Sequence, residues 1–80
     1  MKNLDEVALQ KAFGKKIKSL RKHNQYSQSD LSGRSDLDKT AIQRIERGHN
    51  STLKTLHKLA NAFDISISEL CDIPEQENYL

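Results

Sequence analysis

Apolar residues recur at α-helical spacing along most of this 80-residue chain, and that periodicity restricts the folds it can adopt. Leu9, Phe13, Ile17 and Leu20 are separated by four, four and three residues, so a helix would present them on one buried face. Strands usually come with β-branched runs and with clusters of Gly, Pro and Asn, and both are sparse here. The sequence therefore predicts an all-α fold.

Five helices are expected, over about 4–22, 28–34, 39–47, 52–62 and 67–71. The fourth helix should bury a second apolar set, which comprises Leu53, Leu56, Leu59, Ala60 and Phe63.

Residues at the ends of these segments are of the types that begin or end helices. Ser27, Asp38 and Ser66 are good N-caps, and Gly48 suits a helix C-terminus. Asn24 is expected to end the first helix, because Asn tolerates left-handed backbone there. Together these signals divide the chain into residues 1–10, an N-terminal extension of the first helix, a domain over 11–73, and a flexible acidic tail over 74–80, which begins at a helix-stopping proline.

Composition excludes several classes of function. The longest apolar run is three residues, Val7 to Leu9, which is too short for a membrane helix or a secretory signal, so we expect a cytoplasmic protein with no membrane partner. The single cysteine, Cys71, excludes an internal disulfide and a cysteine-based zinc site, and the closest histidines, His49 and His57, are eight residues apart. We find no catalytic arrangement, and we expect no enzyme, metal, cofactor or small-molecule effector.

The stretch over residues about 27–48 contains two short helices joined by about four residues, which is the outline of a helix-turn-helix. If the second of these helices hides Ile42 and Ile45, its outward face carries hydrogen-bond donors with long reach and no carboxylate. Arg and Lys can bind guanine and Gln can bind adenine through paired contacts, while Thr can offer its methyl group to thymine. This pattern favours contact with the major groove of DNA through Lys39, Thr40, Gln43 and Arg44, whereas Arg47 on the same face is either a phosphate contact or a solvated residue.

Four stretches of the chain resemble a known family: FGKKIKSLR, YSQSDL, AIQRIERG and LKTLHKLANAFDISISEL. They are similar to the first helix, the second-helix start, the third-helix end and the closing segment of the phage-repressor type of helix-turn-helix domain, the Cro/cI-like or XRE family of bacterial and phage regulators. The resemblance covers Phe13 to Cys71 and implies a five-helix, lambda-repressor-like DNA-binding domain. In it, the second and third helices form the helix-turn-helix.

The resemblance also implies roles by position. It implies base reading by Lys39, Thr40 and Arg44, with Gln43 close by, and a phosphate contact by Gln28. From the residues themselves we also expect phosphate contacts by Ser27, Arg47, His49, Asn50 and Lys54. Arg21 and Glu46 match a pair that ties the first helix to the third. Two departures stand out: Asp36 replaces the usual turn glycine, and the loop after Gly48 is one residue shorter than usual and lacks its proline.

Two surfaces have competing interpretations. Ile65, Ile67, Leu70 and Ile73 exceed what the fourth helix needs to cover, and the resemblance implies that this region forms a homodimer interface; alternatively these residues only close the core of one chain. A basic face with Lys11, Lys15, Lys16 and Lys18 is most simply a solvated surface.

These observations favour a sequence-specific DNA-binding transcriptional regulator, a repressor or autoregulator that reads a pseudo-palindromic operator as a homodimer. The alternative is an antitoxin or another protein-interaction module with the same fold. Charge supports the first interpretation: residues 11–58 carry twelve basic against four acidic residues, whereas residues 59–80 carry five acidic residues and no basic one, although the whole chain has a net charge of only +2.

Overall fold

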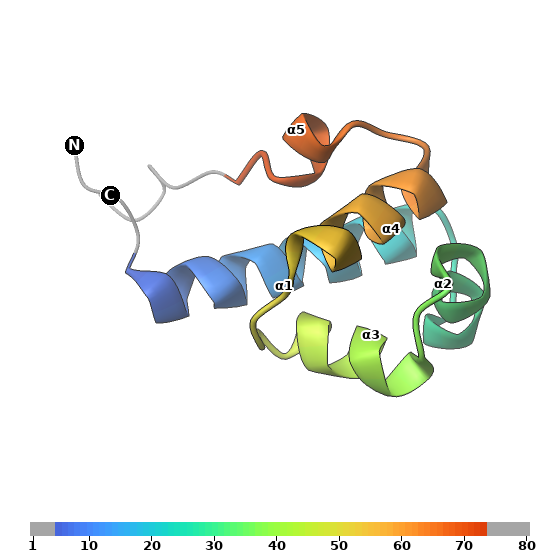
Figure 1. Ribbon diagram of the computed structural model, residues 1–80. Helices are drawn as coiled ribbons and strands as arrows, with labels where there is room; N and C mark the ends of the chain where they lie inside the picture. The colour runs from blue at the N-terminus through green and yellow to red at the C-terminus, as the bar shows by residue number, and fades with distance from the viewer. Residues whose placement is uncertain (1–4, 74–80) are drawn as a thin grey trace.

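The computed structural model describes residues 5–73 and forms five α-helices and no strand over that range (Figure 1). The helices are α1 (Glu6–His23), α2 (Gln28–Ser35), α3 (Lys39–Glu46), α4 (Leu53–Phe63) and α5 (Ile67–Leu70). The expected all-α class and the order of the five helices are confirmed. The predicted acidic tail over 74–80 lies outside the described residues, as do residues 1–4 of the expected N-terminal extension.

The helix starts follow local capping chemistry. Ser27 and Ser66 each form a capping box with the acidic residue three positions later, in which side chain and backbone satisfy each other in both directions. The two bonds from Ser27 lower the pKa of the Asp30 carboxyl below its ordinary value. Asp38 occupies the N-cap position of α3 as expected, but its side chain makes no capping hydrogen bond.

The helix ends use left-handed residues, and one expected position is wrong. Asn24 has φ −87°, and the left-handed residue after α1 is instead Gln25, with φ 61°. The amide of Gln25 donates to the carbonyl of Lys22 and that of Tyr26 donates to the carbonyl of Arg21, which is the Schellman pattern. The same pattern ends α3, where Gly48 has φ 96°.

The core lies where α1, α3 and α4 converge, closed at its ends by α2 and α5 (Figure 1). It consists of Phe13, Ile17, Leu31, Ile42, Ile45, Leu59, Ala60, Phe63 and Leu70. Two residues expected in it are exposed: Leu53 is 72% exposed and Leu9 is 41% exposed. Both lie in the first turns of their helices.

Close backbone contact joins α1 to the end of α3. A Cβ atom on Gly14 would lie 2.5 Å from the carbonyl oxygen of Ile45 and 2.9 Å from that of Glu46. One on Gly48 would lie 3.0 Å from Cγ of Lys11. Glycine at these two positions therefore allows α1 to lie directly on the C-terminal end of α3 and so sets the position of α3.

Candidate nucleic-acid interface

The turn between α2 and α3 sets the angle of α3 against the body of the domain. Asp36 adopts left-handed backbone, with φ 59° and ψ 35°, where glycine is usual in the family that the sequence resembles. The hydroxyl of Ser32 donates a hydrogen bond to the carbonyl of Leu37, and Nζ of Lys58 lies 3.3 Å from the Asp36 carbonyl oxygen. Contacts from α2 and α4 thus stabilise a turn whose backbone is costly for a non-glycine residue.

The outward face of α3 is formed by the side chains opposite its two buried isoleucines. Ile42 is 0% and Ile45 is 4% exposed, so both pack into the core. Of the predicted base-reading residues, Lys39, Thr40 and Arg44 are exposed and Gln43 is half-buried. Arg47, which follows as the C-cap of α3, is also exposed. The structure thereby brings the predicted donors together on one accessible helix face.

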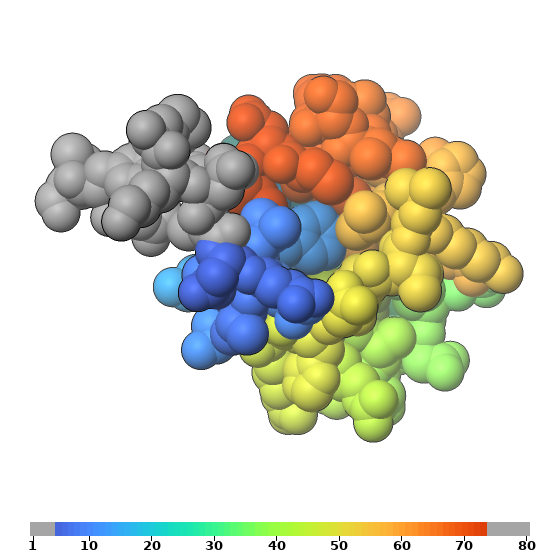
Figure 2. All heavy atoms as spheres, turned by 60° about the vertical axis from the view of Figure 1, so that its left-hand side comes forward, coloured from blue at the N-terminus to red at the C-terminus, as the bar shows by residue number. Residues whose placement is uncertain are grey.

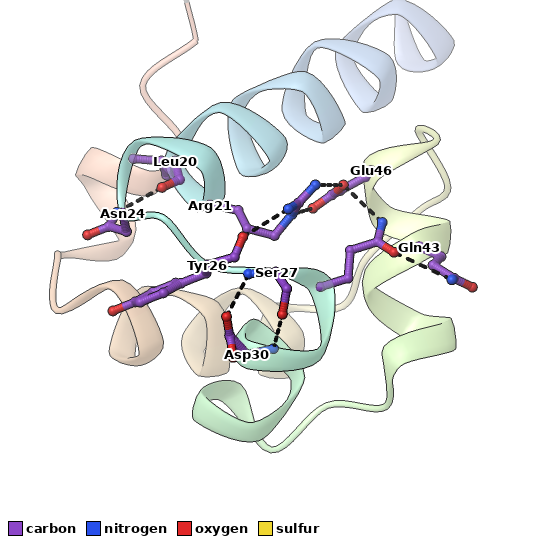
Figure 3. Close-up of polar contacts among 9 residues, drawn as sticks. Leu20, Arg21, Asn24, Tyr26, Ser27, Asp30, Gln43 and Glu46 are labelled. Atoms are coloured by element: carbon purple, nitrogen blue, oxygen red, sulfur yellow. Dashed lines mark hydrogen bonds and ion pairs between the residues drawn. The ribbon is translucent and has the colours of Figure 1, made fainter.

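A buried polar network ties that helix to α1 and α2 (Figure 3). Nε and Nη2 of Arg21 donate to the two carboxylate oxygens of Glu46 at 2.7 and 3.1 Å. Nη1 of Arg21 donates to the carbonyl of Tyr26 at 2.9 Å. The side-chain hydrogen bonding between Arg21 and Glu46 is the main cause that raises the pKa of Arg21 above its ordinary value. The carboxylate is thereby turned inward, which leaves the outward face of α3 free of negative charge.

The network continues to the start of α2. Nε2 of Gln28 donates to Glu46 at 3.2 Å, and Oε1 of Gln28 accepts from Nε2 of Gln43 at 3.5 Å. A predicted phosphate contact and a predicted base contact are therefore linked before any DNA is present. Such links restrict the rotamers of both amides and reduce the entropy that binding would cost.

The other predicted phosphate contacts lie at the two ends of the same face. Ser27 is exposed at the N-cap of α2, and its oxygen accepts from the Asp30 amide at 2.9 Å. His49 and Asn50 are exposed in the loop after α3, and Lys54 is exposed in the first turn of α4. The N-termini of α2 and α4 also present free amides, which favour anions.

A groove of about 380 Å³ runs between α3 and the start of α4. It joins the Arg44 side chain to the loop and the first turn of α4, and its lining also includes Ala41, Ser51, Thr52 and Thr55. Sequence reasoning did not assign these last residues to the interface, because the groove exists only where α3 and α4 come together.

A second, mostly apolar hollow of about 320 Å³ lies beside this groove and shares His49, Asn50 and Ser51 with it (Figure 2). There the blue first turns of α1, the yellow loop after α3 and the orange segment that follows α4 meet. Its apolar lining is Leu9, Phe13, Leu56 and Ile73, together with Cys71, whose thiol pKa is raised by partial burial. Sequence reasoning missed this surface because it took Leu9 to be part of the core.

The predicted dimer residues do not share one environment. Leu70 is 0% exposed and belongs to the core of its own chain, so it offers no surface to a partner. Ile65 and Ile67 are half-buried and pack against that core, and Ile73 lines the hollow. The alternative interpretation, closure of the monomer core, therefore describes Leu70.

Other kinds of site were sought in the described part of the chain. No helix there has the length and apolar character needed to cross a membrane. Residues 5–73 contain no group of three or more His, Cys, Asp or Glu side chains placed to hold a metal ion.

Comparison with known proteins identifies the family. The restriction-modification controller protein C.AhdI from Aeromonas hydrophila is 38% identical, with a TM-score of 0.76 over 79% of this chain and 97% of that chain. The restriction-modification controller protein C.Esp1396I is 31% identical, with a TM-score of 0.70 over 79% of this chain and 87% of that chain. A hypothetical transcription factor, NHTF from Neisseria, shares the fold at 24% identity, with a TM-score of 0.79 over 99% of this chain and 92% of that chain.

No curated protein sequence matches the chain significantly. The helix-turn-helix family HTH_3, in contrast, matches residues 17–70, which include the C-terminal part of α1 and all of α2, α3, α4 and α5. The protein therefore belongs to this family, and it is a DNA-binding regulator of the XRE type with a lambda-repressor-like fold and not an enzyme.

Proposed function

We propose that this protein is a transcriptional repressor or autoregulator of the restriction-modification controller type, which binds a pseudo-palindromic operator as a homodimer. The observation that carries the proposal is the outward face of α3, where Lys39, Thr40 and Arg44 are exposed and no carboxylate competes with DNA acceptors. The sequence identity with two restriction-modification controllers supports the choice among regulators of this size.

In this proposal α3 lies in the major groove. Arg44 and Lys39 bind the acceptor edge of guanine, Gln43 binds adenine, and Thr40 contacts a thymine methyl or a phosphate. Ser27, Gln28, Arg47, His49, Asn50 and Lys54 contact phosphates on either side, which sets the register of α3 but carries no sequence information.

Two chains are needed to read a two-fold operator, and the hollow described above supplies a self-complementary surface. Leu53 protrudes with 72% of its surface exposed and lies three residues before Leu56, so both are on the same side of α4. Each chain thus offers one projecting apolar side chain and one apolar hollow, as an isologous contact requires. We place the interface at Leu53, Leu9 and Ile73 and leave Leu70 in the core. Two copies of α3 would then read half-sites about one helical turn, ~34 Å, apart.

Arg44→Ala tests the base-reading assignment. It should weaken binding to the selected operator by about 1–3 kcal/mol and relax the preference at one base position, because a bidentate contact is lost. Operators would be obtained by selection from a random duplex pool and affinities measured by fluorescence anisotropy. The matched control is Lys54→Ala, which should weaken all duplexes equally and lower the salt slope by about one. Equal sequence preference in wild type and Arg44→Ala would contradict the assignment.

The apolar hollow also supports a second candidate, an antitoxin or other protein-interaction module in which the hollow receives a different protein. The selection experiment separates the two. A palindromic consensus with two half-sites favours the homodimeric regulator, whereas a monomer without sequence preference favours the interaction module.

A further inference from the structure

The lysines of α1 fall into two groups once the helix is placed. Lys11, Lys15, Lys18 and Lys22 are spaced by four, three and four residues, and all four are exposed on one side of the helix. Lys16 points elsewhere: it is half-buried, and its Nζ donates to the carbonyl of Asp72 at 3.1 Å. We name the first four residues the α1 lysine row.

This row lies beside the contact between α1 and α3. Lys11 packs against Gly48 at the end of α3, and Gly14 packs on the carbonyls of Ile45 and Glu46. Arg21, which bonds Glu46, lies two turns after Gly14 along the same edge of α1. Lys18 is four residues after Gly14 and three before Arg21, so it flanks the same seam on its solvent side. The row therefore begins beside Arg47 and His49 and runs along the edge of the proposed DNA-binding face.

No negative charge within the described residues neutralises this row. From residue 7 to residue 23 the helix carries no acid, and the ion pairs among residues 5–73 involve Arg21 and Lys58 only. Four like charges at these spacings repel one another, which costs a few tenths of a kcal/mol for each pair at i, i+4. A polyanion bound along the row would remove that repulsion.

We propose that the α1 lysine row binds the phosphate backbone of the same duplex outside the base pairs that α3 reads. The inference rests on the proposed function and extends it, since it adds a surface that the helix-turn-helix itself does not contain. The row extends from residue 11 to residue 22, or about 16 Å of helix, which corresponds to about five base pairs of duplex. DNA flanking each half-site would therefore contribute affinity but no sequence preference.

The experiment compares Lys15→Gln/Lys22→Gln with wild type on two duplexes, the selected operator alone and the same operator extended by about six base pairs at each end. On the extended duplex, the slope of log affinity against log salt should fall by about two, since each lost phosphate contact removes about 0.9. On the short duplex the two proteins should have nearly the same slope. Both substitutions replace exposed side chains, and thermal unfolding would verify that the double variant folds.

The matched control is Lys16→Gln, which removes the same charge from the other side of α1. It should leave both slopes unchanged. An equal effect of Lys16→Gln, or an unchanged slope for the double variant, would overturn the proposal and assign the row to a solvated surface. Failure of the proposed function has a different signature, because wild type would then show no preference for one sequence over another on either duplex.

Discussion

At the scale of single residues, the recognition helix depends on one buried carboxylate. The side chain of Glu46 is 5% exposed and that of its partner Arg21 is 11% exposed. Burial of both charges costs solvation that the pair only offsets when its geometry is complete. The pair therefore contributes position more than stability: it fixes α3 against α1 and keeps the carboxylate away from DNA.

Glu46→Leu should lower the free energy of unfolding by about 3 kcal/mol, because it leaves the Arg21 guanidinium buried without a counter-charge. Urea denaturation measures this loss. Arg21→Met/Glu46→Leu, which replaces the whole pair with apolar side chains, should recover at least half of it. A double variant as unstable as the single one would show that the pair itself, and not the orphaned charge, supplies the stability.

Gln25 is the residue whose backbone is most easily improved. It is exposed and left-handed, with φ 61°, and it lies in the Schellman turn that ends α1. Left-handed backbone costs a residue with a side chain about 1–2 kcal/mol, and glycine loses about 0.5–1 kcal/mol of that advantage to chain entropy. Gln25→Gly should therefore raise stability by about 0.5–1 kcal/mol, measured as an increased urea midpoint. Gln25→Ala, which keeps the Cβ atom, should not.

At the scale of elements, α1 and the end of α3 approach closely because each has a glycine, which lacks a side chain, at the contact. Gly14 brings α1 onto the carbonyls at the end of α3, and Gly48 makes room for the backbone of Lys11. The glycine in α2 is different: a Cβ atom on Gly33 would meet nothing within 4 Å. Packing thus requires glycine at positions 14 and 48, whereas Gly33 only weakens its helix.

Gly14→Ala and Gly33→Ala should have opposite effects on thermal stability. The first forces a Cβ atom to 2.5 Å from the Ile45 carbonyl oxygen, so the helices must separate, at a cost of about 1–3 kcal/mol. The second should stabilise α2 by up to about 1 kcal/mol, because alanine is the better helix former. Differential scanning calorimetry would measure both. A stabilising Gly14→Ala would mean that α1 and α3 are not in contact at this point.

At the scale of the whole molecule, charge and apolar surface are separated. The basic residues of 11–58 include those of α3, its C-cap and the α1 lysine row. The acidic residues of 59–80 all come after the last residue of α4 in the sequence. The apolar hollow lies between the first turns of α1 and the segment around Cys71 and Ile73.

Leu53→Asp should convert the proposed dimer to a monomer. The carboxylate would be buried in the apolar hollow of the partner chain, which is costly, and the two-fold symmetry would repeat that cost at both contacts. Analytical ultracentrifugation should show the mass of one chain, and operator binding should become weaker and steeper in protein concentration. The fold should keep its stability, because Leu53 is exposed in the single chain. Lys54→Asp, one residue away, is the control for added charge in the ultracentrifugation measurement, where it should keep the mass of two chains; it is not a control for operator binding, because it removes a proposed phosphate contact.

Much of this fold is encoded in neighbouring residues. Caps such as Ser27 and Ser66 act within one turn, and helical periodicity is set by residues three and four apart, so the chain alone predicted five helices and the helix-turn-helix. The exposure of the α3 donors followed from the same local pattern, since burial of Ile42 and Ile45 leaves one direction for the opposite face.

Contacts between distant residues decided the rest, because whether an apolar or charged side chain is covered depends on which helix packs over it. Leu53 and Leu9 fit the helical pattern as well as Leu59 does, yet the tertiary arrangement leaves them exposed and buries Leu70 completely. The same arrangement separates Lys16, which contacts the Asp72 carbonyl, from the lysines that flank the end of α3. Periodicity gives each helix its faces, but only packing determines which face meets the core, which meets solvent, and which is left for DNA or for a second chain.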